Sequence, residues 1–297
     1  MKNRIENDPV WIVMRSMNDR DVIGETLERV RSQRGPRFKL LNIDSGSTDG
    51  TLDIISDYTD RLIRIRPEEY IPGRVINTGM SETDTEVVVF LNSDATPVDD
   101  HWLENLLREI RGDRVAAVYG RQMSRPDTLP LFHKDNERAF GDGNLAATWT
   151  HFFSMANSAV VRSVWEQRPF DEEIRYSEDT EWSYWARKAG FDVRYACEAA
   201  VMHSHNYTLA QSYKRHHGEG AADAWIFDFP PGKMKLPRIL VSAGVEVMRD
   251  FAFCLKTGRP GGLLHSIPLR LTQRIGRYKG YWKEKKKQDE ILTKIHI

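Results

Sequence analysis

Acidic side chains follow two apolar runs of the sequence, each at the point where the run ends. Asp44 ends one run and is followed by the small, polar stretch 45–50, while Asn92, Ser93 and Asp94 end another. A carboxylate such as that of Asp94 can ligate a hard divalent cation, which can bridge two phosphates. Asp44 could accept hydrogen bonds from the edge of a nucleobase, beside the hydroxyls and free amides of 45–50. A capped turn and an Asx turn are the alternative, structural interpretations.

A third acidic cluster begins a predicted helix and contains Glu178, Asp179 and Glu181, followed by Trp182 and Trp185. Acids near a helix N-terminus each stabilise the helix by about 0.3–1 kcal/mol, which is the structural interpretation. Three acids in four residues exceed what a helix start needs, so we predict that one carboxylate is the general base for a hydroxyl acceptor. The two tryptophans could stack on a sugar face or pack in the core.

Two histidines, His203 and His205, alternate in the sequence. Their imidazoles share one face if the preceding strand extends through them. Such a pair suits a metal ion or a diphosphate, although single histidines are usually structural. His216 and His217, which adjoin Arg215, are weaker candidates.

Apolar periodicity predicts the elements that position these side chains. Strands alternating with helices favour an α/β fold with an open, mostly parallel sheet, in which ligands bind beyond the carboxyl ends of the strands. Asp44 and Asp94 end two such strands, so they should share one edge and form a site for a metal-bridged nucleotide diphosphate. The predicted strands are 10–16, 38–44, 61–66, 86–94 and 115–122, and the predicted helices are 22–33, 51–60, 75–84 and 99–112.

The alternation of strands and helices stops after residue 121. We predict a long loop over 125–153, because turn residues and aromatics occur there without a clear period. Order then resumes with the stretch 154–167, a helix over 177–191 and a short strand over 192–205, and helices separated near 256–262 end the chain. The predicted domains are a catalytic domain of 1–228, with a nucleotide-binding half at about 8–120 and an acceptor half at about 121–228, and a basic helical extension of 229–297.

Charge is balanced over the 297 residues, with 43 basic and 43 acidic side chains, but it is distributed unevenly. Residues 231–297 contain 15 Lys and Arg against 5 Asp and Glu. A solvated helical face would explain this balance. Because the stretch 270–287 mixes apolar and basic residues, contact with an anionic membrane surface is the sharper hypothesis, and a homodimer interface is another. No nucleic-acid-binding fold is recognisable, so nucleic acid is not an expected partner.

Several classes of protein are not expected from the composition. Cys197 and Cys254 are too few for a disulfide framework or a cysteine zinc site, which favours a reducing compartment. The first thirty residues lack the apolar core and cleavage site of a signal peptide. No run of about 18 uncharged apolar residues predicts a membrane span. We therefore expect a cytoplasmic protein, with peripheral contact to the inner face of the membrane through the basic tail.

Seven segments occur in the order seen in family-2 glycosyltransferases, and the chain resembles the bacterial rhamnosyltransferase-like branch over about 10–217. The resemblance implies the GT-A fold, a nucleotide-sugar donor, a divalent metal (Mg²⁺ or Mn²⁺) and transfer to a hydroxyl with inversion of the anomeric centre. The segments are "MRSMND", "IDSGSTDGT", "GRVINTG", "VVVFLNSDATP", "NSAVVRSVWEQRPFDE", "SEDTEWSYWARKAGF" and "VMHSHNYT".

The resemblance also implies roles for single residues. Asp94 would be the main metal ligand, since Asn92 replaces the first Asp of the family's Asp-x-Asp motif, and His203 or His205 would complete the site. Asp179 would be the general base, with Glu178 beside it. Trp182, Asn157 and Trp149 are the expected acceptor contacts. Donor contacts are expected from Arg15, Ser16 and Asn18 in the first loop, Asp44 and Ser45 at the base, Arg74 and Asn77 near the diphosphate and ribose, and Asn92, Ser93 and Asp94.

The expected reaction moves a sugar, rhamnose in the nearest branch, from a dTDP-, UDP- or GDP-sugar to a glycan or lipid-linked acceptor in surface polysaccharide synthesis. "QSYKRH" matches the motif of processive synthases only loosely, which favours transfer of one or a few sugars. A nucleotidyltransferase is an alternative, but the first loop has no glycine before Gly24. A non-catalytic carbohydrate-binding protein is another, and the acids at 44, 94 and 179 count against it.

Overall fold

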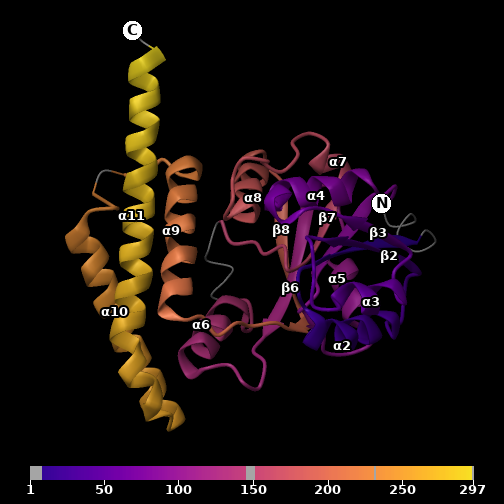
Figure 1. Ribbon diagram of the computed structural model, residues 1–297, viewed down its shortest axis with the longest axis horizontal. Helices are drawn as coiled ribbons and strands as arrows, with labels where there is room; N and C mark the ends of the chain where they lie inside the picture. The colour runs from indigo at the N-terminus through magenta and orange to yellow at the C-terminus, as the bar shows by residue number, and fades with distance from the viewer. Residues whose placement is uncertain (1–8, 145–150, 231, 296–297) are drawn as a thin grey trace. The chain divides into compact units, whose positions relative to one another are not determined.

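The computed structural model describes residues 9–144, 151–230 and 232–295 (Figure 1). The chain divides into two compact units, each treated by itself below. The first consists of Met1–Pro126, Asn136–Ile174 and Glu178–Ser204, and the second of Asp127–Asp135, Arg175–Ser177 and His205–Ile297.

A sheet forms the centre of the first unit, with eight strands among the described residues in the order β3-β2-β1-β4-β7-β6-β8-β5. The strands β3, β2, β1 and β4 are parallel, whereas β7 is antiparallel to both β4 and β6. The predicted α/β fold is confirmed. The strands are β1 Val10–Ser16, β2 Phe38–Asp44, β3 Arg61–Arg64, β4 Val87–Asn92, β5 Thr96–Pro97, β6 Val115–Met123, β7 Asn157–Val161 and β8 Asp192–Met202.

Helices cover both faces of the sheet: α2 contacts α3 on one face, and α4 contacts α8 on the other (Figure 1). Ile12 to Met14 and Val88 to Leu91 are therefore fully buried, as continuous apolar runs are in parallel strands. The helices and 3₁₀ turn are α2 Arg20–Arg31, α3 Thr51–Ser56, η1 Pro67–Glu69, α4 Pro72–Ser81, α5 Trp102–Arg108, α6 Pro130–Phe140, α7 Arg162–Trp165 and α8 Glu178–Lys188.

The second unit is helical, with α9 Leu209–Ile226, α10 Leu236–Thr257, η3 Pro260–Gly262 and α11 Leu263–Ile295. Helices α9 and α11 pack backbone to backbone, because a Cβ on Gly220 would lie 2.0 Å from the carbonyl oxygen of Arg277 and one on Gly280 would lie 1.9 Å from that of His217. None of the helices in the described part of the chain has the length and apolar composition that a membrane span requires.

Two helices were not predicted from the sequence. Helix α6 lies within the predicted loop 125–153. Its buried residues, Leu131 and Phe140, stand at its two ends with a polar middle between them, so no helical period is visible. Helix α9 contains Gly218 and Gly220, which normally weaken a helix, and here they allow close packing against Tyr176 and α11. In both α6 and α9, tertiary contacts outweigh the helix propensity of the local sequence.

Candidate active site

The strands β1, β2 and β4 end at the same edge of the sheet, as predicted. Their register pairs Ser16 with Asp44 and Arg15 with Asn92. The guanidinium of Arg15 donates a hydrogen bond to Oδ1 of Asn92 at 2.7 Å. Three of the predicted donor segments therefore meet at one place, which comes directly from parallel pairing of strands that end in polar residues.

Asp44 has a structural task, because its carboxylate organises the turn that follows it. It is fully buried, and Oδ1 accepts from the backbone N–H groups of Gly46 at 3.0 Å and Ser47 at 2.8 Å. Oδ2 accepts from the hydroxyls of Ser47 at 2.6 Å and Ser16 at 2.8 Å. Ser45 is also buried. The structural interpretation thus accounts for these contacts of Asp44, and its predicted contact with a nucleobase stays a prediction.

The loops after β1 and β2 are bonded to each other through Asn18. This residue has a φ of 56°, its N–H donates to the hydroxyl of Ser47 at 2.8 Å, and its Oδ1 accepts from the N–H of Thr48 at 2.8 Å. Asp49 accepts from the N–H of Arg20 at 3.1 Å, which ties the second loop to the start of α2. These hydrogen bonds hold the two loops at the strand edge in one arrangement.

Asp94 and His203 lie side by side beyond the ends of β4 and β8, with Oδ1 of Asp94 3.4 Å from Nε2 of His203. Strand β8 ends at Met202, so the predicted extended strand through both histidines is wrong. His205 follows His203 by two positions and begins the last segment of the second unit. Ligand atoms of Asp94, His203 and His205 lie within 4.8 Å of one another, a spacing that could hold a metal ion.

Gln122, which was not predicted, fixes the orientation of His203. Its Nε2 donates to the hydroxyl of Ser154 at 2.8 Å, and its Oε1 lies 2.7 Å from Nδ1 of His203. Because this oxygen can only accept, Nδ1 carries the proton, and Nε2 is left to face Asp94. Arg125 also supports Asp94, because its guanidinium donates a hydrogen bond to the backbone carbonyl oxygen of Asp94 at 2.8 Å.

Asp19 is a second residue that sequence reasoning missed. Its carboxylate accepts from the hydroxyl of Ser93 and from the N–H of Met17. Burial raises the pKa of Asp19, these two hydrogen bonds lower it in part, and the negative charges of Asp94 and Asp49 raise it further. The sequence feature that could have identified Asp19 was its position beside Asn18 in the first loop. The strand edge therefore concentrates negative charge.

The start of α8 separates the three acids of the third cluster. Glu181 is paired with Arg168 at 2.5 Å and is thus structural. Glu178 is buried, and Asp179 is half-buried, with Oδ1 accepting from the N–H of Thr180 at 2.7 Å. Ser177, directly before the helix, has a φ of 62°, which a serine rarely adopts. Asp179 remains the carboxylate that suits a general base.

Two of the predicted acceptor contacts lie in the core, and the third, Trp149, lies outside the described residues. Trp182 is fully buried and stacks on Phe170 with ring centroids 4.8 Å apart. Asn157 is fully buried, accepts from the indole of Trp102 at 2.9 Å and donates to the carbonyl of Ala199 at 2.9 Å. The predictions for Trp182 and Asn157 are therefore wrong in this conformation, because neither reaches solvent.

Asn77 is also structural. Its amide nitrogen donates to the Phe170 carbonyl and to Glu172, both at 2.9 Å, and its oxygen accepts from the Trp165 indole at 2.9 Å and the Phe170 N–H at 3.0 Å. All four of its hydrogen-bonding positions are filled, which leaves none for a ribose. Arg74 has a half-exposed side chain 3.5 Å from Glu172, so its predicted contact with a diphosphate stays a prediction.

Two solved glycosyltransferases share this fold, the GT-A fold. The mannosyltransferase PcManGT from Pyrobaculum calidifontis, in complex with GDP-Man and Mn²⁺, aligns with a TM-score of 0.65 at 18% identity over 94% of this chain and 88% of that one. Glucosyl-3-phosphoglycerate synthase from Mycobacterium tuberculosis, in complex with Mn²⁺, UDP and phosphoglyceric acid, aligns with a TM-score of 0.55 at 16% identity over 76% and 81%. At these identities the likeness shows the fold alone.

The sequence comparisons define the family. Residues 11–169, over half of the chain, match the family model "Glycosyl transferase family 2", and the chain belongs to this family. The O-antigen chain rhamnosyltransferase WbaN of Salmonella anatum is 31% identical over 87% of this chain and 90% of its own length. The O-antigen chain rhamnosyltransferase RfbN of Salmonella typhimurium is 28% identical over 92% and 96%. The predicted family and enzyme class are therefore confirmed.

Proposed function

We propose that this enzyme is an inverting, metal-dependent glycosyltransferase that transfers rhamnose from a nucleotide-diphosphate donor to a hydroxyl of a glycan or lipid-linked acceptor in surface polysaccharide synthesis. The observation that carries the proposal is the acidic strand edge, where Asp94 faces His203 and the pKa of Asp19 is raised. The rhamnosyltransferases among its relatives support the choice of sugar and of pathway.

The group of side chains at the strand edge fits a divalent cation and favours Mn²⁺ over Mg²⁺. One carboxylate and two imidazoles are available, and Mg²⁺ prefers a set of oxygen ligands, whereas Mn²⁺ accepts imidazole more readily. Asp94 and His203 would hold the ion, and His205 would complete the set. When bound, the ion would neutralise the diphosphate that leaves in the reaction.

The chain's own residues have three tasks in this reaction. Asn18 and Asp44 hold the two loops that bind the donor in one arrangement, which lowers the entropy lost on binding. Arg15 carries positive charge at the strand edge, beside the phosphates of a dTDP-, UDP- or GDP-sugar. Asp179 would accept the proton of the acceptor hydroxyl as that oxygen attacks the anomeric carbon, with Glu178 beside it.

A lipid-linked acceptor would place the enzyme at the cytoplasmic face of the cytoplasmic membrane. The positive balance of residues 231–297 supports this location, because anionic lipids attract basic segments. The acceptor sugar would then be presented at the surface where the enzyme works.

The proposal is tested by incubating the purified enzyme with dTDP-rhamnose, a lipid-linked glycan acceptor and Mn²⁺. We expect a rhamnosylated product whose anomeric configuration, measured by NMR, is opposite to that of the donor. Asp179→Asn should bind the donor nucleotide with unchanged affinity and lose turnover. Retention of configuration, or normal turnover of Asp179→Asn, would contradict the mechanism, and turnover with other donors alone would contradict the choice of sugar.

A further inference from the structure

Helix α10 exposes apolar side chains and buries acidic ones. Its buried residues recur every three or four positions, so they form one face, and two of them, Glu246 and Asp250, are carboxylates. The opposite face carries Val241, Met248 and Leu255, which are 67%, 70% and 76% exposed. Val245 lies in the same row and is 45% exposed. An amphipathic helix of a water-soluble protein normally has the reverse arrangement.

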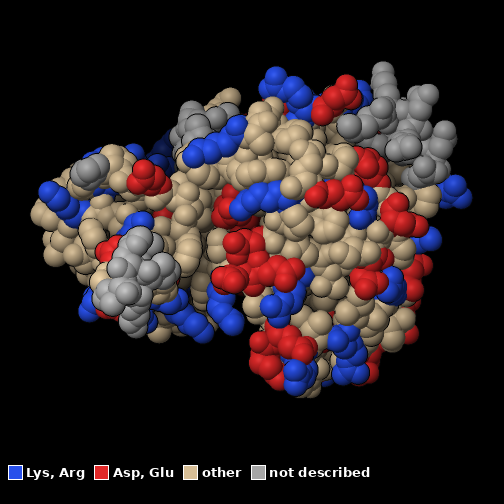
Figure 2. Space-filling view, turned by 90° about the horizontal axis from the view of Figure 1, so that it is seen from above, with Lys and Arg blue, Asp and Glu red and all other residues tan. Residues whose placement is uncertain are grey.

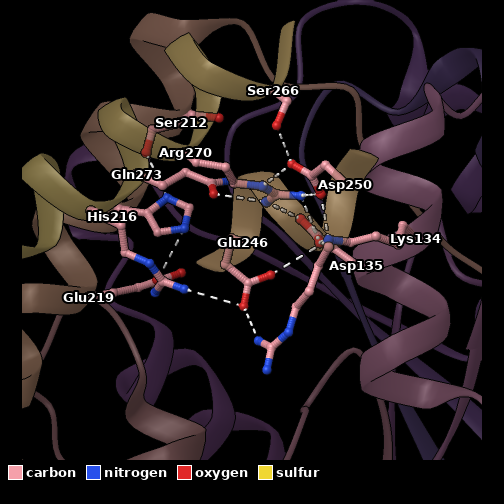
Figure 3. Close-up of polar contacts among 12 residues, drawn as sticks. Lys134, Asp135, Ser212, His216, Glu219, Glu246, Asp250, Ser266, Arg270 and Gln273 are labelled. Carbon is pink, nitrogen blue, oxygen red and sulfur yellow. Dashed lines mark hydrogen bonds and ion pairs between the residues drawn. The ribbon is translucent and has the colours of Figure 1, made fainter. Parts of the chain in front are cut away.

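A network of paired charges holds α10 in this orientation (Figure 3). Asp250 is fully buried and accepts from Lys134, from the hydroxyl of Ser266 at 2.6 Å and from the guanidinium of Arg270 at 2.8 Å. Glu246 lies 3.5 Å from the ammonium of Lys134. Rolling α10 to bury its apolar row would separate these pairs, which is strongly unfavourable for buried ions. The exposure of the row is therefore built into the fold.

Exposed basic residues border the apolar row. Arg238, Arg249 and Lys256 are separated by eleven and seven positions, which places them along one side of the row. Arg249 also donates to Glu246 at 2.5 Å, and half of its side chain is exposed. Leu264, near the start of α11, is a further exposed apolar residue, with 84% of its surface exposed.

The surface of the stretch 232–283 carries positive charge alone. Glu246 and Asp250 are its two acids, and both are buried. The first unit differs, because acidic and basic side chains are interspersed over the face seen in Figure 2. The exposed basic residues of the stretch are Lys233, Lys235, Arg238, Arg249, Lys256, Arg259, Lys279 and Lys283.

We propose that this face of α10, formed by Val241, Val245, Met248 and Leu255 with the bordering basic residues, binds the surface of an anionic lipid bilayer. The apolar row would enter the boundary between headgroups and acyl chains, and the basic residues would contact the headgroups. A second copy of the chain fits less well, since it would bring another surface of purely positive charge against the first. The inference rests on the proposed function, because it names the surface from which the lipid-linked acceptor is reached.

Flotation of the full-length enzyme tests the inference with two kinds of vesicle: phosphatidylcholine alone, and phosphatidylcholine with one-third phosphatidylglycerol. We expect flotation with the anionic vesicles and at least about tenfold less with the neutral ones. Val241→Gln with Met248→Gln should reduce flotation on anionic vesicles by at least about tenfold. Leu129→Gln with Leu209→Gln, which changes exposed apolar residues of the same unit outside α10, is the matched control and should float as the wild type does.

Three results would overturn the inference. One is equal flotation of the Val241 and Met248 variant and the wild type, and another is equal flotation on both vesicles. The third is a wild-type dimer without vesicles, measured by analytical ultracentrifugation, that the same variant converts to a monomer. Nucleotide binding to the variant should be unchanged, so a failed membrane contact is distinguishable from a failed donor site. Arg238→Gln with Lys256→Gln should weaken flotation on anionic vesicles only.

Discussion

Both units of this enzyme bury acidic side chains, but the groups around these side chains shift their pKa values in opposite directions. In the second unit, burial alone would raise the pKa of Asp250, yet hydrogen bonds from Arg270, Lys134 and Ser266 hold it below its usual value (Figure 3). In the first unit, burial raises the pKa of Asp19, and the hydrogen bonds that it accepts come from neutral groups.

The difference separates a structural cluster from a ligand site. Asp250 is opposed by an ammonium and a guanidinium, so the second unit needs no further ion to be stable there. Asp19 lies close enough to Asp94 and Asp49 for their charges to disfavour its ionisation, which is where a bound cation would lower the energy. Burial of a carboxylate does not by itself identify a functional site, whereas the balance of charge around it does.

The largest expected effect is on stability, in the second unit. Asp250→Leu removes the carboxylate that Lys134 and Arg270 share and leaves them with Glu246 and Asp135 as remaining partners, so we expect it to lower the free energy of unfolding by about 3–5 kcal/mol. Chemical denaturation measures this loss. Replacing all three residues together, with Lys134→Met and Arg270→Met, should restore most of it. A single variant as stable as the wild type would show that the network is not what fixes α10.

The next effect is on turnover, in the first unit. Asp94→Asn keeps the size of the side chain and removes the charge of the proposed metal ligand, so we expect kcat to fall about 10²–10³-fold. The free energy of unfolding should change by less than about 0.5 kcal/mol, in contrast to Asp250→Leu. Steady-state sugar transfer and denaturation measure the two quantities. Undiminished turnover would remove Asp94 from the site.

A smaller effect is expected where a neutral residue orients a ligand. Gln122→Leu removes the acceptor that holds Nδ1 of His203, so we expect Mn²⁺ affinity to fall about 10–100-fold. Mn²⁺ binding can be followed by electron paramagnetic resonance. Gln122→Glu keeps an acceptor and should retain most of the affinity. Equal loss in both variants would show that the packing of this side chain matters and its oxygen does not.

The smallest effect is a difference in pH dependence. The folded-state pKa of Asp19 is raised above 3.8, so without metal its contribution to stability is lost as pH rises through that folded value. The pKa of Asp250 is lowered, so its contribution is present above 3.8 and lost as pH falls below it. Unfolding followed as a function of pH should show that the free energy of unfolding of Asp19→Asn rises relative to that of the wild type as the pH increases. A gain at lower pH would contradict the assigned direction.

Strands and the edge they share could be predicted from the sequence, because continuous apolar runs ending in polar residues are visible locally. The roles of Asn77, Asn157 and Trp182 could not. Asn77 is bonded to Phe170, 93 residues away, and Asn157 to Trp102, 55 residues away. Such partners are known only after folding.

The predicted contact of Asp44 with a nucleobase stays a prediction, because the same residue also has a structural task. Its carboxylate organises the turn after β2, and a turn residue and a ligand-binding residue look alike in sequence. Gly46, with a φ of 91° and a Cβ position 2.7 Å from Pro67, is the part of that segment that only glycine fits. Asp19, a single acid in a loop, and Gln122, a single amide near the end of β6, were missed because neither belongs to a sequence pattern.

The central claim is that the acidic strand edge is a site for a metal-bound nucleotide. Calorimetric titration of the wild type with dTDP, UDP and GDP, each with Mn²⁺ and again with a chelator, tests it most directly. We predict that one nucleotide binds with Mn²⁺ and not with chelator, that Asp94→Asn abolishes this binding, and that Leu129→Gln with Leu209→Gln retains it. Equal binding with and without Mn²⁺, or undiminished binding to Asp94→Asn, would contradict the claim.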